Sequence, residues 1–428
     1  MTSTTTVSQG RLEGTVRLPP SKSYTHRAVL MASLAEGRST ISNALYSRDT
    51  NATIAACRAM GAGVEQSGTT LTIDGTRPRL PDDVVNVENS GTTLRFMTST
   101  LATAPDGFVV LTGDSSIRRR PMQPLLDTLG ELGVEAWTAK KNGCAPVIVR
   151  AGGIRGGDAT IRGDVSSQFV SSLLISTPMA SGDTSLAVAD AVSRPYIEAT
   201  LALSRLFGVE VVREEYARFN VQAGQSYHHA DFSVPADFSS ASFIVAAVGL
   251  VGGRVVLQDL DAALPQGDSA ILKIAAGMGV DVREDVNSVT VEADGSKLKG
   301  GTFNLGDTPD LLPVVAALAL RCESPVEVVG TAHARFKETD RIAILAGELS
   351  KLGVKIEERP DGMKISPGGE MHSALLDAHD DHRMFMAFSL ASMLVPGGAP
   401  VVGAESLDVS YPTFLEDMER LGARVRST

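Results

Sequence analysis

The stretch AMGAGVE, at residues 59–65, decides the fold because variants of it return five more times along the chain. The later copies read ELGVEA, LFGVEV, GMGVDV, KLGVKI and RLGARV. Each copy is typical of a helix that ends at a glycine and is followed by a β-strand. The pattern predicts an internal repeat whose glycines, spaced by 69 to 75 residues, are Gly61, Gly133, Gly208, Gly279, Gly353 and Gly422.

A second phrase precedes each glycine, where polar residues lead into an apolar segment rich in alanine, leucine and serine. Serine, threonine, aspartate and asparagine accept hydrogen bonds from the free N–H groups of a first helical turn, so each phrase predicts a capped helix. We expect Ser21 or Ser23 to be the first cap. The segments are apolar nearly all round, as buried helices are, and read PSKSYTHRAVLMASL, ENSGTTLRFMTSTLA, GDVSSQFVSSLLIST, PADFSSASFIVAAVG, GDTPDLLPVVAALAL and HDDHRMFMAFSLASM.

The residues between the two phrases predict strands and a second helix. Pieces such as FVVLTG and TSLAVAD are typical of strands, and MQPLLDTLGEL is typical of an amphipathic helix. Each unit therefore contains two helices and about four strands. Because about 70 residues are too few for a separate core, neighbouring units must pack together. We predict an α/β (α+β) fold of two domains with three units each.

Charge and hydropathy exclude several classes of function. The formal net charge of -11 argues against nucleic-acid or anionic-membrane binding, which needs a broad basic face. The longest apolar runs, FIVAAVGLV and LLPVVAALAL, are about half as long as a membrane span. The amino terminus, MTSTTTVSQG, has neither the charged nor the apolar region of a signal peptide. We expect a soluble cytoplasmic protein.

Cysteine and histidine give no metal signature. Cys57, Cys144 and Cys322 stand singly, without the spacing of a zinc site or a disulfide framework, which favours a reducing compartment. His228 and His229 are adjacent, so their side chains point to different sides. We predict no metal site.

Charged residues occur at equivalent points of the repeat, beyond what plain caps require. Helix N-termini attract anions through free N–H groups and the helix dipole, so helices of common orientation would form a phosphate-binding cleft between the domains. A structural repeat with plain caps remains the alternative, in which Lys22 is a surface charge, Asp310 a cap and His382 a structural histidine. The additions are Lys22, Arg27, Arg95, Arg118, Arg119, Arg120, Ser166, Ser167, Gln168, Lys337, Glu338, Asp340, Arg341, Asp381, His382 and Arg383.

The motifs PPSKSYTHR, NSGTTLR, LTGDSSIRRRPM, GDVSSQF, VSRPYI, FKETDR and DDHRM together resemble the 5-enolpyruvylshikimate 3-phosphate synthase family along essentially the whole chain. The resemblance implies the enolpyruvyl transferase fold, with two similar domains of three βαβαββ-type units and helices buried under curved sheets. It also implies two crossovers, so that residues 1–18 join 236–428 in one domain and residues 19–235 form the other. The active site is expected in the cleft between them.

The same resemblance implies the substrate-binding residues. Ser23 and Arg27 match positions on shikimate 3-phosphate, and Lys22 is shared with phosphoenolpyruvate. The other positions expected on shikimate 3-phosphate are Ser166, Ser167, Gln168, Ser193, Tyr196, Asp310, His333 and Lys337. Those expected on phosphoenolpyruvate are Gly91, Arg120, Gln168, Arg341 and Arg383. Arginine suits these positions because its planar fork pairs bidentately with carboxylate or phosphate.

The implied reaction transfers the enolpyruvyl group of phosphoenolpyruvate to the 5-hydroxyl of shikimate 3-phosphate by addition and elimination. Asp310 is the candidate base for the hydroxyl. Glu338 is the candidate acid for C3, with Lys22 as its rival, and His382 relays protons or orients Glu338. The reaction needs no metal, nucleotide or other cofactor, and the family habit is a monomer.

The chain departs from the family at two positions. Val409, in DVSYP, stands where many members have a lysine, and His333 replaces an asparagine that some members direct at the shikimate hydroxyls.

Three other functions are alternatives: UDP-N-acetylglucosamine enolpyruvyl transferase, a non-catalytic phosphosugar-binding protein, and an RNA end-processing enzyme. Ser23 after Lys22 and a cysteine-free GDSSIRRRPM loop argue against the first, carboxylates in an anion site argue against the second, and the acidic charge argues against the third.

Overall fold

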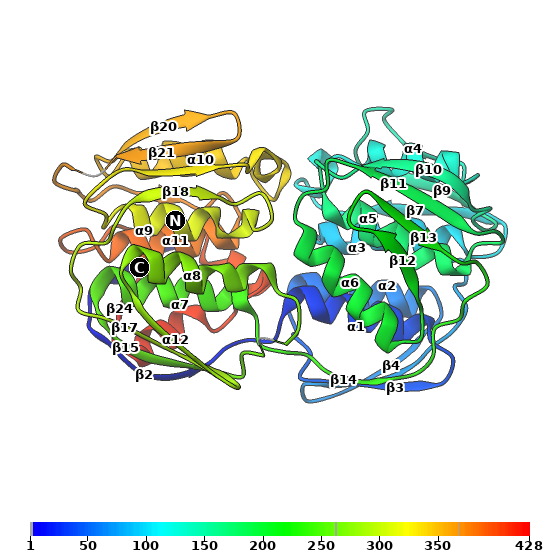
Figure 1. Ribbon diagram of the computed structural model, residues 1–428, viewed down its shortest axis with the longest axis horizontal. Helices are drawn as coiled ribbons and strands as arrows, with labels where there is room; N and C mark the ends of the chain where they lie inside the picture. The colour runs from blue at the N-terminus through cyan, green and yellow to red at the C-terminus, as the bar shows by residue number, and fades with distance from the viewer. Residues whose placement is uncertain (1–2, 262, 367) are drawn as a thin grey trace. The chain divides into compact units, whose positions relative to one another are not determined.

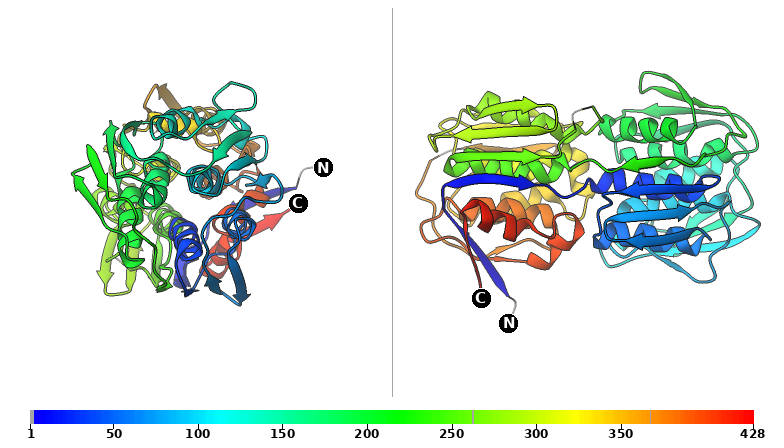
Figure 2. Two further views of the ribbon diagram at one scale, coloured as in Figure 1. Left: turned by 90° about the vertical axis from the view of Figure 1, so that its right-hand side faces the viewer. Right: turned by 90° about the horizontal axis from the view of Figure 1, so that it is seen from below.

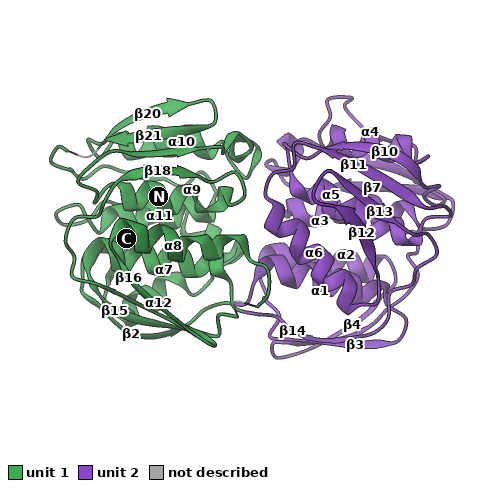
Figure 3. Ribbon diagram, viewed as in Figure 1, with its two compact units in different colours: residues 1–19, 236–428 green, residues 20–235 purple. Residues whose placement is uncertain are grey.

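Figure 1 shows a computed structural model that describes residues 3–261, 263–366 and 368–428. The chain divides into two compact units. The first, here called the terminal unit, comprises Met1–Pro19 and Ala236–Thr428, and the second, the central unit, comprises Pro20–Pro235 (Figure 3). The sequence predicts that the first boundary follows Leu18, and in the structure it follows Pro19, one residue later.

The central unit has three four-stranded sheets, with the strand orders β14-β3-β5-β4, β6-β7-β9-β8 and β10-β11-β13-β12. Its helices are α1 (Lys22–Leu34), α2 (Arg48–Ala59), α3 (Gly91–Ala102), α4 (Gln123–Glu131), α5 (Ser167–Ser176) and α6 (Arg194–Leu206). Its strands are β3 (Arg38–Ser42), β4 (Gly63–Ser67), β5 (Thr70–Asp74), β6 (Val85–Asn86), β7 (Gly107–Thr112), β8 (Ala136–Thr138), β9 (Val147–Ala151), β10 (Gly157–Arg162), β11 (Thr184–Ala189), β12 (Val211–Glu214), β13 (Arg218–Val221) and β14 (Asp231–Ser233).

The terminal unit repeats this plan, with the strand orders β16-β17-β15-β2, β18-β19-β21-β20 and β22-β23-β1-β24. Its helices are α7 (Phe238–Val251), α8 (Ala270–Met278), α9 (Leu312–Ala319), α10 (Arg341–Ser350), α11 (His382–Ser392) and α12 (Phe414–Leu421). Its strands are β1 (Thr4–Ser8), β2 (Leu12–Arg17), β15 (Gly253–Gln258), β16 (Asp281–Asp285), β17 (Ser288–Ala293), β18 (Gly301–Asn304), β19 (Val326–Val329), β20 (Lys355–Arg359), β21 (Gly362–Ser366), β22 (Leu376–Asp377), β23 (Val401–Val402) and β24 (Arg424–Ser427).

All six sheets share one topology, which confirms the predicted repeat. In each, one pair of strands at an edge of the sheet is parallel and the other pairings are antiparallel, as in β6 with β7 followed by β7 with β9 and β8 with β9. In the sheet that begins at β16, the parallel pair is β2 with β15. Parallel strands need a crossover, and α3 supplies it between β6 and β7. The repeating element is therefore βαβαββ.

Two exchanged strands explain why the chain passes between the units twice. Strand β2 precedes α1 in the chain but pairs with β15, and β14 precedes α7 but pairs with β3. The last sheet closes through β1 and β24, where the N–H of Thr4 donates to the carbonyl of Thr428 at 2.8 Å. The two ends of the chain consequently lie side by side (Figure 2).

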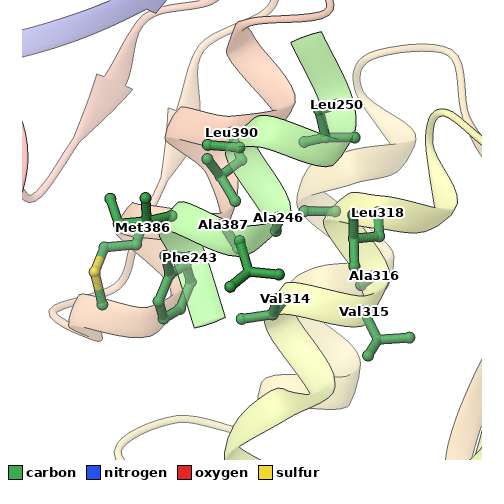
Figure 4. Packing of buried hydrophobic residues seen from close by; sticks show 14 of the residues in the cluster. Phe243, Ala246, Leu250, Val314, Val315, Ala316, Leu318, Met386, Ala387 and Leu390 are labelled. Carbon is green, nitrogen blue, oxygen red and sulfur yellow. The ribbon is translucent and has the colours of Figure 1, made fainter. Parts of the chain in front are cut away.

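The first helix of each repeat forms the core, as the apolar segments predict. Every residue of α7 is buried, and α7, α9 and α11 contact one another. Figure 4 shows Phe243, Ala246, Val314, Ala387 and Leu390 of these three helices packed together. Small alanines let the helix backbones approach closely, which fixes where the polar first turns of these helices lie.

The six repeat glycines all adopt the left-handed conformation that favours glycine, with φ between +84° and +114°. Each follows the second helix of its unit and precedes a strand, so the predicted helix ends are confirmed.

The predicted caps are only partly confirmed. The side chains of Ser90, Ser166 and Asp381 accept from the first turns of α3, α5 and α11. Ser21 begins α1 but its side chain makes no capping bond, and Ser23 lies inside the helix, so that prediction is wrong. The backbone N–H of Ser21 donates to the carbonyl of Pro235 at 2.7 Å, so this residue contacts the second chain crossing.

Within the described residues, no helix is long and apolar enough to cross a membrane. The same part of the chain holds no group of three or more histidine, cysteine, aspartate and glutamate residues arranged to bind a metal ion.

Candidate active site

Two charged clusters, one in each unit, contain most of the residues that the sequence singles out. The terminal cluster consists of Asp310, Lys337, Glu338, Arg341, Asp381 and Arg383. The central cluster consists of Lys22, Arg27, Asp49, Gly91, Arg95, Arg120 and Gln168.

Arg341 is the centre of the terminal cluster, and its side chain is 1% exposed. It is the first residue of α10, and its guanidinium donates to Asp310 Oδ1 at 2.7 Å, Glu338 Oε2 at 2.7 Å and Asp381 Oδ2 at 2.8 Å. Burial acts to lower the pKa of Arg341, but the three carboxylates outweigh it and raise the pKa. A buried cation therefore holds three acidic side chains together.

Asp310 is contacted by three cations. It lies in the short 3-10 helix Pro309–Leu311, just before α9, where Arg341 and Lys337 reach Oδ1 and Arg383 donates to Oδ2 at 3.1 Å. The Lys337 ammonium is 3.6 Å from Oδ1. Burial lowers the pKa of Lys337, and the charge of Asp310 partly opposes this effect. The sequence candidates Asp310, Lys337, Glu338, Arg341 and Arg383 are thus brought into one network.

The two histidine candidates are buried beside this network. His382 is the first residue of α11, and its Nδ1 lies 3.9 Å from Asp381 Oδ1. His333 lies in the 3-10 helix Ala332–Phe336, on the loop that leads to Lys337. Val409 is also buried, at the end of the 3-10 helix Ala404–Val409, so this position contributes an apolar side chain.

Lys22 is paired with a residue that the sequence analysis missed. Its Nζ donates to Asp49 Oδ2 at 3.0 Å, and the two side chains are 14% and 5% exposed. Lys22 is the first residue of α1, and Asp49 lies in the first turn of α2. The shared geometry of the repeats thus brings a lysine and a carboxylate from two helix starts into contact.

Arg27 is buried inside the central unit and ties α1 to α6. Its guanidinium donates to Thr200 Oγ1 at 2.8 Å and to the carbonyls of Tyr196 and Ser23, each at 2.9 Å. Its Cζ lies 5.3 Å from the centre of the Phe96 ring. Burial lowers the pKa of Arg27 to about 10, so the side chain is still cationic at neutral pH.

Gly91 lies between two guanidinium groups. A Cβ atom at this position would stand 2.6 Å from Nη1 of Arg120 and 2.8 Å from Nη1 of Arg95. Arg120 donates to Asn89 Oδ1 at 3.1 Å, and Arg95 donates to Gln168 Oε1 at 2.6 Å. Two largely buried cations therefore meet at the start of α3, where a carboxylate or phosphate would find both charge and free N–H groups.

The remaining central candidates stand at two other helix starts. Ser166 caps α5 by accepting from the N–H of Gln168 at 3.3 Å, and Ser167 is the first residue of that helix. Ser193 precedes α6 in the left-handed conformation, with φ of 53°, and is followed by Tyr196 in the first turn. These first turns supply the hydroxyl and N–H donors that suit a phosphate.

A chain of neutral hydrogen bonds connects α1, α2 and α3. His26 Nδ1 lies 2.6 Å from Thr53 Oγ1, which lies 2.6 Å from Thr93 Oγ1. The hydroxyl of Thr93 donates to Ser90 Oγ at 2.6 Å, so Thr53 donates to Thr93 and the Nδ1–H of His26 donates to Thr53. Burial, with the charges of Lys22 and Arg27, lowers the pKa of His26 and keeps the ring neutral.

Asp268 is a second carboxylate that the sequence analysis missed. It is buried just before α8, where the hydroxyl of Ser239 donates to it. Burial and the charge of Asp310 raise the pKa of Asp268 to about 6, although Arg383 opposes the rise. Asp49 and Asp268 lie within two residues of the start of the second helix of a repeat, and this shared place is the sequence signal that points to them.

Comparison with known proteins agrees with this arrangement. The family model for EPSP synthase (3-phosphoshikimate 1-carboxyvinyltransferase) matches residues 7–418. The 3-phosphoshikimate 1-carboxyvinyltransferase of Methanothermobacter thermautotrophicus is 46% identical over 418 residues, 97% of each chain, and that of Methanothrix thermoacetophila is 47% identical over 427 residues, 99% of each chain. A solved EPSP synthase structure from Acinetobacter baumannii superposes with a TM-score of 0.82 at 27% identity, covering 100% of both chains. This chain belongs to the EPSP synthase family.

Proposed function

We propose that this chain catalyses transfer of the 1-carboxyvinyl group of phosphoenolpyruvate to the 5-hydroxyl of shikimate 3-phosphate, giving 5-enolpyruvylshikimate 3-phosphate and phosphate. This reaction serves chorismate and aromatic amino-acid biosynthesis. The observation that carries the proposal is the contact of Asp310 with Lys337, Arg341 and Arg383, in a chain that matches the EPSP synthase family over residues 7–418. A carboxylate held among cations suits a reaction that moves protons between two anionic substrates.

Shikimate 3-phosphate is assigned to the hydroxyl-rich helix starts and to the terminal cluster. The α5 and α6 starts offer N–H and hydroxyl donors for its phosphate. Arg27 supports this site because it fixes the carbonyl of Tyr196 from inside the unit. The residues proposed to bind this substrate are Lys22, Ser23, Arg27, Ser166, Ser167, Gln168, Ser193, Tyr196, Asp310, His333 and Lys337.

Phosphoenolpyruvate is assigned to the guanidinium groups around Gly91 and to those of the terminal cluster. Its carboxylate and phosphate both suit arginine forks. Arg341 already contacts three carboxylates, so this substrate would compete with Asp310 and Glu338 for its donors. The residues proposed to bind it are Lys22, Gly91, Arg120, Gln168, Arg341 and Arg383.

In the proposed addition step, Asp310 takes the proton of the 5-hydroxyl while the oxygen bonds to C2 of phosphoenolpyruvate and C3 is protonated. In the elimination step, C3 returns a proton to the group that supplied it, the double bond between C2 and C3 forms again, and the bond between C2 and the phosphate oxygen breaks to release phosphate. The cations stabilise charge on the departing phosphate, and positioning of this kind supplies about 7 to 11 kcal/mol in favourable cases.

Glu338 is the proposed donor to C3. It accepts a hydrogen bond from Arg341, whereas a donor must be protonated, so the proposal requires the anionic substrates to offset this cation. Lys22, paired with Asp49, is the rival donor. His382, beside Asp381, is proposed to orient the network.

The proposal includes a monomeric, cytoplasmic enzyme that needs only its two small-molecule substrates and no metal, nucleotide or other cofactor. Neither nucleic acid nor a membrane is a proposed partner.

A coupled phosphate-release assay tests the function. Phosphate should be released from phosphoenolpyruvate only when shikimate 3-phosphate is present, and Asp310→Ala and Glu338→Ala should each lower kcat by about 100-fold or more. Wild-type turnover in both variants would overturn the assigned roles.

The same assay separates the alternatives. Turnover with UDP-N-acetylglucosamine in place of shikimate 3-phosphate would assign the cell-wall reaction, and binding of shikimate 3-phosphate without phosphate release would assign a phosphosugar-binding protein.

A further inference from the structure

The loop that carries Lys337 and Glu338 rests on the turn of its own β-hairpin. Arg335, in this loop, donates from Nε to the carbonyl of Pro360 at 3.0 Å and from Nη2 to the carbonyl of Arg359 at 2.7 Å. Arg359 is the last residue of β20, and Pro360 lies in the turn between β20 and β21. Two donors of one rigid guanidinium thus fix the loop to the hairpin.

Arg335 also closes the loop on itself. Its Nη1 donates to both carboxylate oxygens of Asp340, at 3.1 Å and 2.8 Å. Asp340 caps α10 by accepting from the N–H of Ala343 at 3.1 Å. Lys337 and Glu338 lie between these two residues in the chain, so the arginine holds both ends of the segment that carries them.

A second attachment lies upstream on the same hairpin turn. The carbonyl of Asp361 accepts from the N–H of Thr331 at 2.8 Å and from its hydroxyl at 3.0 Å, and the Asp361 carboxylate accepts from the N–H of Gly330 at 3.0 Å. The residues between Thr331 and Asp340 are therefore anchored at both ends. Such anchoring sets where side chains on the loop point.

The same device recurs in the central unit. Beside Arg120, the N–H of Met122 donates to the carbonyl of Gly143, in the turn between β8 and β9, at 2.7 Å. After Ser193, the hydroxyl of Tyr216, in the turn between β12 and β13, donates to Glu198 of α6. In three repeats, therefore, the hairpin turn contacts the loop or helix that carries candidate substrate residues.

We propose that Arg335 is a positioning residue, which clamps the loop 331–340 to the β20–β21 turn and so sets the places of Lys337 and Glu338. This inference rests on the proposed roles of Lys337 and Glu338. Arg335 itself is assigned no contact with a substrate. Because misplacing a reacting group by about 1 Å can cost about 100-fold in rate, loss of the clamp should be visible in turnover.

The test compares Arg335→Gln with Arg359→Gln in the full chain. Arg359 is the matched control because its side chain lies on the same hairpin but contacts Glu327 at 3.4 Å and Glu357 at 3.3 Å, both outside the loop. Arg335→Gln should lower kcat by roughly 10- to 100-fold and raise the KM for shikimate 3-phosphate severalfold, with little change in the KM for phosphoenolpyruvate. Arg335→Lys should be intermediate, because an ammonium can keep Asp340 but not the two turn carbonyls at once.

Hydrogen exchange supplies a readout independent of activity. In Arg335→Gln, the amides of residues 332–340 should exchange faster, while those around Arg120 and Ser193 should exchange at the wild-type rate. A general loss of stability would accelerate exchange throughout the protein and would contradict a local clamp.

Two kinetic outcomes also overturn the proposal. One is a kcat and a KM for shikimate 3-phosphate in Arg335→Gln equal to those of Arg359→Gln. The other uses Asp340→Asn and applies if Arg335→Gln does not fold. Asp340→Asn keeps the oxygen that caps α10 but removes the negative charge that Arg335 contacts. Wild-type kinetics in Asp340→Asn would show that the contact with Arg335 does not position the loop. Lys337→Ala and Glu338→Ala distinguish failure of the proposed function from failure of the clamp. Wild-type activity in these two variants would contradict the proposed function. Activity that is lost in them but kept in Arg335→Gln would contradict only the clamp.

Discussion

The two charged clusters differ in how their cations are balanced. In the terminal cluster, the buried guanidinium of Arg341 contacts three carboxylates. In the central cluster, Lys22 is paired with Asp49, but Arg95 donates to the amide oxygen of Gln168, and Arg120 donates to Asn89 and to the hydroxyl of Ser116. The two clusters therefore suit different tasks. A guanidinium group that donates to neutral groups keeps a positive charge that attracts an anion, whereas carboxylates held among cations can move protons.

Removing one buried arginine from each cluster tests this difference most strongly. Arg341→Met removes the one cation that all three carboxylates share, leaving Lys337 and Arg383 on Asp310 alone, and should lower the free energy of unfolding by about 3 to 5 kcal/mol. Arg95→Met removes a cation that donates to a neutral amide and lies over the Phe169 ring, and it should cost less, about 1 to 2 kcal/mol. Urea denaturation of both variants at neutral pH measures the two losses. Equal losses of unfolding free energy would mean that the positive charges of the two clusters are compensated to the same extent.

The fold was largely predictable because its signals are local and repeated six times. A glycine such as Gly61 is required where a helix ends in the left-handed conformation, and that requirement is visible in one short stretch. The fold class and the family are confirmed by the solved relatives and the family model. The position of Ser21 before α1 was predictable, but its missing cap bond depends on the side-chain rotamer, and its backbone contact with Pro235 joins residues far apart in the chain.

The site was predictable in its residue types but less so in its pairings. Motifs identify Lys22 and Arg341, yet the partner Asp49 comes from another helix, and only packing brings it to 3.0 Å from the lysine. Asp268 was missed for the same reason, since its raised pKa depends on burial and on Asp310 across the fold. A carboxylate at a helix start looks like a cap until its neighbours are known.

Gly91→Ala tests whether the guanidinium groups of Arg95 and Arg120 bind phosphoenolpyruvate. The new methyl group would stand less than 3 Å from the ends of Arg120 and Arg95, which are flexible and can move away, so folding should change little. The displaced guanidinium groups would lose charge-assisted bonds to an anion, so the KM for phosphoenolpyruvate should rise roughly 10- to 100-fold.

The control for this substitution is Gly130→Ala, in α4 of the same unit, where nothing lies within 4 Å of the added carbon. This variant should be stabilised by about 0.5 to 1 kcal/mol with the KM unchanged. An unchanged KM in Gly91→Ala as well would mean that the guanidinium groups around it do not bind phosphoenolpyruvate.

Asp268→Asn tests a buried carboxylate outside the terminal cluster whose pKa is affected by the cluster residues Asp310 and Arg383. The folded-state pKa of Asp268, about 6, exceeds its ordinary value of 3.8, so the folded protein binds this proton more tightly than the unfolded chain does. The carboxyl therefore costs stability increasingly as the pH rises from about 4 to about 6. Relative to Asp268→Asn, the wild type should lose about 2 kcal/mol between pH 4 and pH 7. Parallel curves from urea denaturation at several pH values would contradict this.

Thr53→Val is expected to have the smallest effect, and it tests whether the central unit aligns its helices through neutral groups. The variant removes the hydroxyl between His26 and Thr93, leaving the buried Nδ1–H of His26 without its acceptor, and should cost about 1 to 2 kcal/mol. Thr53→Ser keeps the hydroxyl and should stay near the wild type. Because the pKa of His26 is lowered well below its usual value, the difference between the two variants should be the same at pH 6 and pH 8. A difference that changes with pH across this range would show that the ring titrates, and the central unit would then depend on a charged group at this junction, as the terminal unit does at Arg341.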